Sequence, residues 1–266
     1  MFQALVVSAA LQTQAPAEAS FVERMIAATV QLDQPNGDET RTVGTGFLIY
    51  APRPDGTPRV VLVTAAHVLE QMSGDEVRIG WRGQLAGGAW RYEPESIPIR
   101  QAATGQNYFV RHPQRDVAVL EVTAPFAFER AAIPLAWMAD ERGLLPWGVR
   151  PGSEMATLGF PRGLSANQAG FPILRTGHVA SWPLDPVEAF PTFLLDVPVF
   201  PGNSGGPVFA STPAGPLVVG VLTKTVELNS ERLGIGVGIH AVYVREAISL
   251  LDAPQVSAPA PSDPAT

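Results

Sequence analysis

The chain has 266 residues, of which 46% are hydrophobic and only 16% are charged, and its formal net charge is −7. A basic surface for nucleic acid is therefore not expected, and the lack of cysteine rules out disulfides, thiolate metal sites and a cysteine nucleophile. No 18 consecutive residues are apolar, so no membrane-spanning helix is predicted.

Residues 1–20 contain a short apolar run, Phe2 to Leu11, followed by small residues at Ala15 to Ala17. This is the shape of a secretory signal and its cleavage zone, but no cation precedes Arg24. Two interpretations stay open. One is an export signal, which would place the protein in the periplasm or outside the cell. The other is a flexible terminus or a short helix, on a cytoplasmic protein.

Short β-rich segments bounded by turn residues follow from residue 21 onwards, and they form a first cluster of predicted strands. The 25 glycines and 26 prolines of the chain favour such short strands and many loops. The segments are Ala28–Leu32, Gly44–Tyr50, Val60–Thr64, Val77–Trp81, Ala89–Tyr92, Ser96–Arg100 and Asp116–Val122.

Residues 131–152 show no clear period and are interpreted as a crossover to a second cluster of strands. After that cluster, Val244–Leu251 has apolar residues spaced as in a docked helix, and residues 253–266 form a Pro/Ala-rich tail that is predicted to be disordered. Two strand clusters with almost no helix indicate paired barrels or a sandwich rather than an alternating α/β sheet. The second-cluster strands are Glu154–Leu158, Thr176–Ser181, Phe193–Val197, Pro207–Ala210, Leu217–Thr225 and Ile235–Ala241.

Ser204 lies between Asn203 and Gly205 in a glycine-rich stretch that separates two apolar runs. A serine on such a tight turn is a candidate nucleophile, but its hydroxyl needs a base and a group that orients the base. Among four histidines, His67 alone follows an apolar strand and small residues that would clamp the ring. Asp116 heads an apolar strand, where an imidazole N–H would be a suitable partner for its carboxylate. Taken singly, each has an ordinary alternative: a backbone-bonded core histidine and a solvated strand-capping aspartate.

Together these residues carry a resemblance. Thr64–His67, Asp116–Leu120 and Gly202–Pro207 resemble the three active-site blocks of trypsin-like serine proteases, in that family's order of His, Asp and Ser. Within the family the chain is most similar to bacterial, disulfide-free proteases of the HtrA kind. The segments that match the HtrA branch are Gly44–Phe47, Leu158–Pro161 and Asn203.

The resemblance implies an all-β protease domain over residues 21–252. It consists of two six-stranded antiparallel β-barrels, at about 21–130 and 151–245, with a short C-terminal helix. HtrA proteins usually carry a PDZ domain after the protease, and the roughly 15 residues beyond Leu251 are too few for one. Digestive relatives have an aspartate where Asn203 stands, so their zymogen switch is not expected here.

The same resemblance assigns roles to the site residues. Ser204 is the nucleophile, His67 the base and Asp116 its orienter, and the backbone N–H groups of Gly202 and Ser204 form an oxyanion hole. Thr223 matches the position whose hydroxyl supports the aspartate, although an ordinary strand threonine is an equal alternative.

The substrate pocket is also implied by the family. Its floor falls at Pro198 and Val199, where no acid could pair with a substrate arginine or lysine, so small or medium apolar P1 residues are expected. Lys224 could instead favour acidic substrates, and His240 could line the pocket, although its position does not match glutamate-specific relatives. The expected wall residues are Thr223, Lys224, Thr225, Val237, Gly238 and Ile239.

The predicted function is therefore a serine endopeptidase that acts on polypeptides without a cofactor or metal. The alternative is a catalytically weak trypsin-fold module that binds extended peptides. A metal-dependent hydrolase is disfavoured because no two histidines have ligand spacing and there is no HExxH motif. The oligomeric state stays open.

Overall fold

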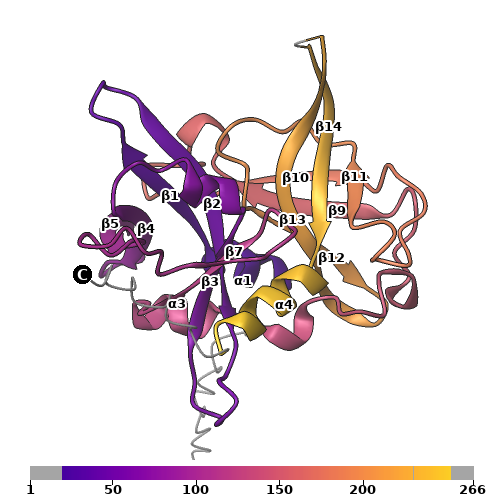
Figure 1. Ribbon diagram of the computed structural model, residues 1–266, viewed down its shortest axis with the longest axis horizontal. Helices are drawn as coiled ribbons and strands as arrows, with labels where there is room; N and C mark the ends of the chain where they lie inside the picture. The colour runs from indigo at the N-terminus through magenta and orange to yellow at the C-terminus, as the bar shows by residue number, and fades with distance from the viewer. Residues whose placement is uncertain (1–19, 230, 253–266) are drawn as a thin grey trace, which may run out of the picture.

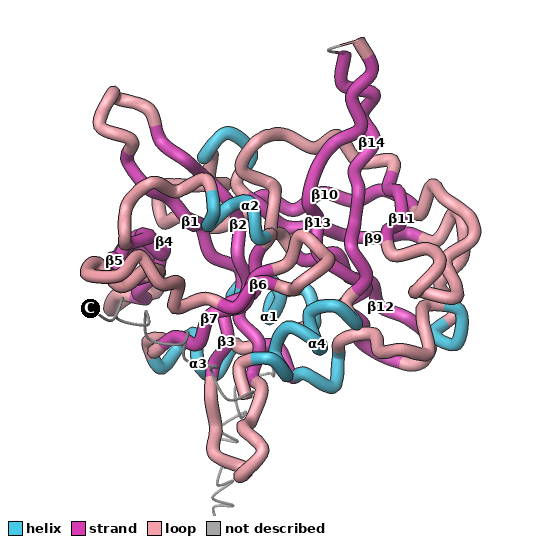
Figure 2. The backbone as a smooth tube through the Cα atoms, in the orientation of Figure 1, coloured by secondary structure: helices cyan, strands magenta, loops and turns pink. Residues whose placement is uncertain are grey.

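The computed structural model describes residues 20–229 and 231–252, which fold into two β-sheets that lie side by side (Figure 1). The predicted export signal or flexible N-terminus, apart from residue 20, and the predicted disordered tail lie outside the described residues. Within the described part, no helix is long and apolar enough to cross a membrane. Figure 2 shows that strands and loops make up most of the chain and that the helices are short.

The first sheet has eight strands, six of which have five or more residues. Its order is β5-β4-β1-β2-β3-β7-β6, and β8 pairs with β2. An isolated bridge between Arg100 and Asn107 brings the two edges of the sheet together, so the sheet closes on itself. Its strands are β1 (Thr29–Pro35), β2 (Arg41–Tyr50), β3 (Val60–Thr64), β4 (Glu76–Gln84), β5 (Trp90–Pro98), β6 (Val110–Arg111), β7 (Ala118–Val122) and β8 (Ile133–Pro134).

The second sheet has six strands in the order β10-β9-β12-β13-β14-β11. A bridge between Val179 and Leu195 joins its edges. The β13–β14 hairpin extends well beyond the body of the sheet, at the top of Figure 1. The strands are β9 (Glu154–Gly159), β10 (Ile173–His178), β11 (Thr192–Leu195), β12 (Pro207–Thr212), β13 (Gly215–Leu228) and β14 (Glu231–His240).

The expected all-β class with two sheets and a C-terminal helix is confirmed. The first sheet has eight strands instead of the expected six, because the two-residue strands β6 and β8 add to β7 and β2, and β8 runs parallel to β2. Other details also differ from expectation. The segments Ala89–Tyr92 and Ser96–Arg100 form one continuous strand, β5, because Pro94 lies on a strand at the edge of the sheet, where a missing N–H breaks no ladder. The described part of the chain also begins with a helix, α1 (Phe21–Ala28), which was not predicted. The signal for it is the reciprocal capping box of Ser20 and Glu23. The other helices are α2 (Ala66–Glu70), α3 (Phe126–Ala131), α4 (Val242–Leu250) and the 3₁₀ turns η1 (Leu135–Trp137), η2 (Leu145–Trp147) and η3 (Pro161–Gly163).

One hydrophobic cluster runs across the boundary between the two sheets. Phe47 and Val63 of the first barrel and Phe209 and Leu222 of the second belong to it, and all four are buried. A separate cluster fills the remainder of the first barrel. Because the shared cluster removes apolar surface of both barrels from water, it holds them in a fixed relation to one another.

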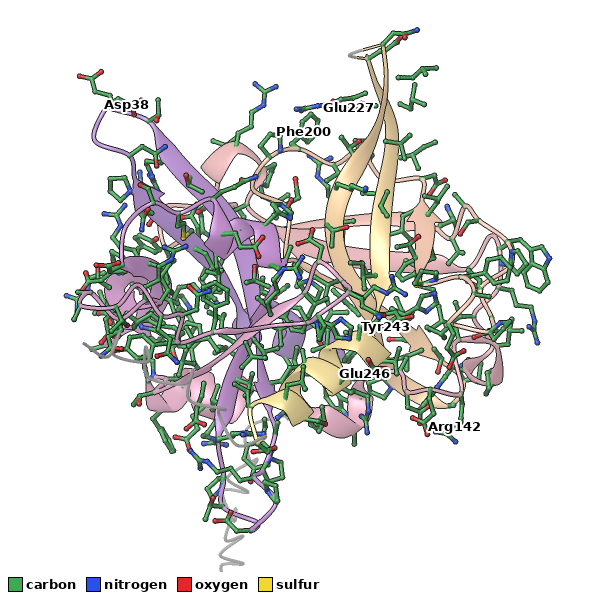
Figure 3. The ribbon with its side chains drawn as sticks, viewed as in Figure 1. Asp38, Arg142, Phe200, Glu227, Tyr243 and Glu246 are labelled. Carbon is green, nitrogen blue, oxygen red and sulfur yellow. The ribbon has the colours of Figure 1, made fainter. Side chains whose placement is uncertain are left out.

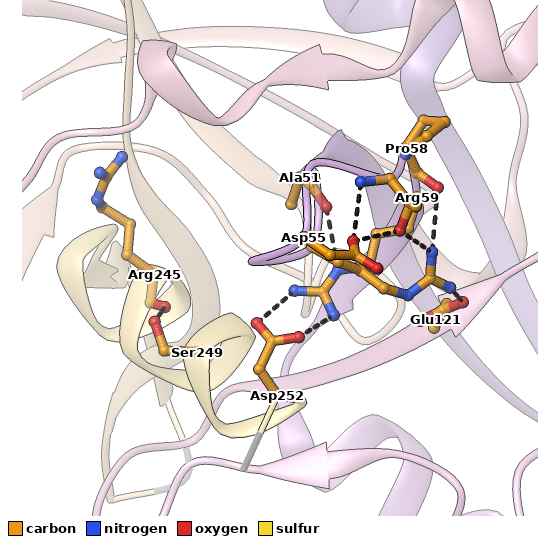
Figure 4. Close-up of polar contacts among 10 residues, drawn as sticks. Ala51, Asp55, Pro58, Arg59, Glu121, Arg245, Ser249 and Asp252 are labelled. Carbon is orange, nitrogen blue, oxygen red and sulfur yellow. Dashed lines mark hydrogen bonds and ion pairs between the residues drawn. The ribbon is translucent and has the colours of Figure 1, made fainter.

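An ion pair also ties the C-terminal helix to the first barrel. The buried guanidinium of Arg59, just before β3, donates to both carboxylate oxygens of Asp252 at 2.7 and 2.9 Å (Figure 4). Its Nε donates to the carbonyl oxygen of Ala51. Such a bidentate, charge-assisted contact fixes the end of α4 against the loop between β2 and β3.

Candidate active site

His67 lies in the first turn of α2, directly after β3. The apolar strand ends at Thr64 rather than continuing to the histidine, and Ala65 and Ala66 are fully buried beneath the turn. The imidazole is therefore carried on a short helix that is packed onto the first barrel, with about a third of its surface exposed.

Asp116 lies in the loop that enters β7 and holds His67 at two points. Its Oδ2 is 2.7 Å from His67 Nδ1, and its Oδ1 accepts the backbone N–H of His67 at 2.9 Å. Burial alone would raise the pKa of the carboxyl, but the hydrogen bonds from the ring and backbone of His67 outweigh it and lower the pKa of Asp116. The ionised carboxylate thus favours the tautomer that carries a proton on Nδ1 and leaves Nε2 free to accept one.

Ser204 lies in the loop between β11 and β12, where two glycines are required by the backbone. Gly202 has φ +94°, and a Cβ there would overlap the carbonyl oxygen of Phe160. Gly205 has φ +90°, and a Cβ there would overlap the carbonyl oxygen of Thr45. These left-handed conformations fold the chain back on itself and present the serine at a tight turn.

Five consecutive amides of this loop divide into two groups. Three donate to backbone carbonyls: Asn203 N to Phe200 O at 3.0 Å, Gly205 N to Leu222 O at 2.7 Å and Gly206 N to Asn203 O at 3.0 Å. Among residues 20–229 and 231–252, the amides of Gly202 and Ser204 have no acceptor. They are the two donors available to a ligand.

Thr45 of β2 joins the serine loop to the first barrel, a role not anticipated from the sequence. Its buried hydroxyl donates to Gly202 O at 2.6 Å and accepts the backbone N–H of Phe160 at 3.2 Å. Its own amide donates to Ser204 O at 2.8 Å. In the sequence, Thr45 is noticeable only because it lies in the HtrA-like segment Gly44–Phe47. That resemblance does not predict any of these contacts.

Arg162 also contacts the loop through its backbone. It has φ +53°, unusual for a residue with a side chain, and its N–H donates to Pro201 O at 2.6 Å. Because N–H and C=O point in opposite directions across a trans peptide, this contact directs the Gly202 N–H away from η3.

The hydroxyl of Ser204 donates to Thr223 O at 2.7 Å. In the part of the chain that the structure describes, no hydrogen bond joins Ser204 to the His67 ring. The hydroxyl of Thr223 donates to Val237 O at 3.2 Å, as an ordinary strand threonine does, and not to Asp116.

All three predicted catalytic side chains line one groove of about 470 Å³ between the barrels. Of the predicted pocket residues, Val199, Thr223, Lys224 and Thr225 line it as well. Pro198, Val237, Gly238 and Ile239 are not in its lining. The predicted oxyanion residue Gly202 also lines the groove. The lining residues that were not predicted from the sequence are Val43, Val68, Gln71, Phe200, Pro201, Glu227 and Arg232.

The other histidines lie away from the groove. His240 is buried beside Phe193, at 5.1 Å between ring centroids, and both of its ring nitrogens lack partners in the described structure. His112 is buried and contacts Glu246 at 2.9 Å. Glu246 belongs to α4, on which Figure 3 labels Tyr243 and Glu246. No three His, Asp or Glu side chains within residues 20–229 and 231–252 could hold a metal ion together.

A two-barrel, all-β fold with histidine, aspartate and serine side chains in a groove between the barrels is the architecture of the trypsin-like serine hydrolases. Comparison with protein families agrees: the trypsin-like peptidase domain matches residues 44–221, more than half of the chain, and the protein belongs to this family.

Solved structures with this fold include the HtrA-type protease AlgW. With AlgW bound to a tripeptide, the TM-score is 0.55 at 18% identity, and the match covers 87% of this chain and 62% of that chain. With AlgW bound to a decapeptide, the TM-score is 0.53 at 18% identity, with coverage of 87% and 66%. This chain thus spans less than two thirds of the AlgW chains. No curated protein sequence matches it significantly.

Proposed function

We propose that the protein is a serine endopeptidase that uses Ser204, His67 and Asp116 as a catalytic triad. The observation that carries the proposal is the two-point contact of Asp116 with His67, at 2.7 Å to Nδ1 and 2.9 Å to the backbone N–H, in the same groove as Ser204. A carboxylate that fixes both the ring and its backbone leaves Nε2 as the free basic nitrogen.

In the proposed reaction, Ser204 Oγ attacks the carbonyl carbon of the scissile peptide bond while His67 Nε2 takes the hydroxyl proton. His67 then gives this proton to the leaving amine, and a water molecule repeats the sequence to hydrolyse the acyl-enzyme. Asp116 stabilises the imidazolium of His67 that forms during acylation and again during hydrolysis of the acyl-enzyme. Its lowered pKa keeps the carboxylate ionised at neutral pH.

The two free amides of the serine loop support a second part of the proposal. When the carbonyl carbon becomes tetrahedral, its oxygen acquires negative charge and needs hydrogen-bond donors. Gly202 N–H and Ser204 N–H are the loop amides without an acceptor in the described structure. Losing one such donor typically reduces kcat by about a hundred- to a thousand-fold.

Small or medium apolar P1 residues are the proposed preference, because Val199 lines the groove and no carboxylate of the predicted pocket residues could pair with a basic P1 side chain. Polypeptides are the proposed substrates. The AlgW structures with a tripeptide and a decapeptide are consistent with an extended peptide in a fold of this kind.

One observation favours a second candidate, a trypsin-fold module that binds peptides but cleaves them poorly. The Ser204 hydroxyl is bonded to Thr223 O and not to the base. If this arrangement persisted with a peptide bound, the nucleophile would stay inactive.

A fluorophosphonate probe separates the two candidates, because it reacts only with an activated serine. Covalent labelling of the folded protein that disappears in Ser204→Ala and in His67→Ala is the expected result for an endopeptidase. Correctly folded protein that binds peptides but takes up no label would instead establish the binding module.

A further inference from the structure

Positive charge without a carboxylate partner gathers along the groove. Two acids line the groove, and both are occupied: Asp116 by His67, and Glu227 by Arg232 at 3.0 Å. Lys224, the only lysine of the chain, is exposed on β13 in the groove lining and forms no ion pair within the described residues.

Two further cations lie at Phe200, on the serine-loop side of the groove. The guanidinium carbon of Arg175 is 5.1 Å from the centre of the Phe200 ring, and that of Arg162 is 5.9 Å away. Neither arginine has an ion pair in the part of the chain that the structure describes, although Arg175 donates one hydrogen bond to Pro198 O. Figure 3 shows Phe200 and Glu227 on the same edge of the molecule, toward the β13–β14 hairpin.

The protein as a whole is acidic, with a net charge of −7. Elsewhere on the described surface many arginines pair with acids, as Arg142 does with Asp140 and Arg53 does with Glu121. Stacking on an aromatic ring holds a guanidinium in place while its N–H groups remain free to donate. Two guanidinium groups fixed near one ring are therefore ready to bind a carboxylate with little further loss of side-chain freedom.

We infer that the groove selects polypeptide segments with acidic side chains near the cleaved bond, held by Lys224 in the groove lining and by Arg162 and Arg175 at Phe200. This inference rests on the proposed endopeptidase function and names its substrate class. The P1 residue itself stays apolar, because Val199, at the predicted pocket floor, is uncharged and lines the groove.

The expected size of the preference follows from exposed ion pairs, each of which changes binding by about 1.4- to 5-fold. A peptide with glutamate at a favoured position should have a kcat/KM about 2- to 5-fold above that of its glutamine counterpart. The ratio should fall toward one as salt shortens the Debye length to about 3 Å at 1 M.

The test is a peptide library that carries glutamate or glutamine in equal amounts at each of three positions on either side of the cleaved bond, read by mass spectrometry. It is run on the full chain and on Lys224→Gln, Arg162→Asn and Arg142→Gln. Asparagine is chosen at position 162 because it tolerates φ +53° and keeps the backbone N–H that contacts Pro201. Arg142→Gln removes the same charge at the opposite edge of the molecule (Figure 3).

The expected result is glutamate enrichment that Lys224→Gln and Arg162→Asn each reduce, at different peptide positions, and that Arg142→Gln leaves intact. The glutamate-to-glutamine ratio is internal to each variant, so a partly unfolded preparation does not alter it. Equal cleavage of both residues by protein that still reacts with fluorophosphonate would overturn the inference alone. Absence of both cleavage and labelling would overturn the proposed function and this inference with it.

Discussion

The hydroxyl of Ser204 donates to the carbonyl oxygen of Thr223 on β13, at 2.7 Å. Because the same hydroxyl would have to face His67 during catalysis, the proposed reaction begins with a rotation about χ1 of Ser204 from one staggered position to another. The base needs no such movement, since Asp116 already holds it at the ring and at the backbone.

The contact between Asp116 and His67 predicts the effect of Asp116→Asn. The asparagine would still accept the backbone N–H of His67, but its amide nitrogen would face Nδ1 and favour the tautomer with its proton on Nε2, which cannot act as a base. We expect peptide hydrolysis to fall by about 10⁴-fold while thermal unfolding changes little. Near-normal turnover of a peptide substrate would exclude Asp116 from the mechanism.

Thr45 should act as a positioning residue for the serine loop. In Thr45→Val the shape is kept, but the buried Gly202 O and Phe160 N each lose a partner, at a cost of about 1–3 kcal/mol per group. We expect lower stability in denaturant unfolding and slower fluorophosphonate labelling. Thr45→Ser keeps the hydroxyl and should recover most of the labelling rate. If serine and valine labelled equally slowly, the hydroxyl would have no positioning role.

Buried His240 should make the protein less stable in acid. Burial lowers the pKa of His240 from 6.5 to about 4, against the opposing effects of Asp185 and the backbone of Phe190. Above pH 6.5 the imidazole is neutral in both the folded and the unfolded chain. Between pH 6.5 and pH 4 only the unfolded chain binds the proton, so the free energy of unfolding falls as the pH falls, by about 3 kcal/mol at pH 4.

His240→Phe tests this expectation, because the ring keeps its packing against Phe193 and cannot titrate. Urea unfolding of the variant at a series of pH values should show a smaller loss of stability between pH 6.5 and pH 4. An unchanged slope would mean that other groups account for the acid sensitivity.

The ion pair of Arg59 and Asp252 should contribute to the stability of the whole domain. In Asp252→Asn the buried guanidinium keeps hydrogen-bond partners but loses its counter-charge, which we expect to lower the free energy of unfolding by about 1–3 kcal/mol. Glu39→Gln, at the exposed tip of the β1–β2 hairpin, removes one negative charge without this contact and should change stability by less than about 0.5 kcal/mol. Equal effects in the two variants would show that net charge, not the ion pair, is responsible.

The all-β class and the candidate site residues could be predicted from the amino acids because the sequence signals for both are local, within short segments of the chain. Short β-rich runs bounded by turn signals identify strands such as β2 and β3. The blocks around His67, Asp116 and Ser204 each form one local turn or strand end, and the structure brings all three to one groove. The position of α1 had a local signal as well, in its capping box.

The remainder of the site depends on contacts between distant segments. The hydroxyl of Thr45 donates to the carbonyl oxygen of Gly202, which lies 157 positions away in the sequence. No local sequence pattern predicts which buried hydroxyl will bind which carbonyl. The positions of Lys224 in the groove lining and of Arg162 and Arg175 at Phe200 likewise result from packing, because the three residues come from separate elements. The orientation of the Ser204 hydroxyl toward Thr223 also depends on a contact between distant segments. A side-chain torsion follows the acceptors that the folded chain places around it, and these are supplied by strand β13 and not by the serine's own neighbours in the sequence.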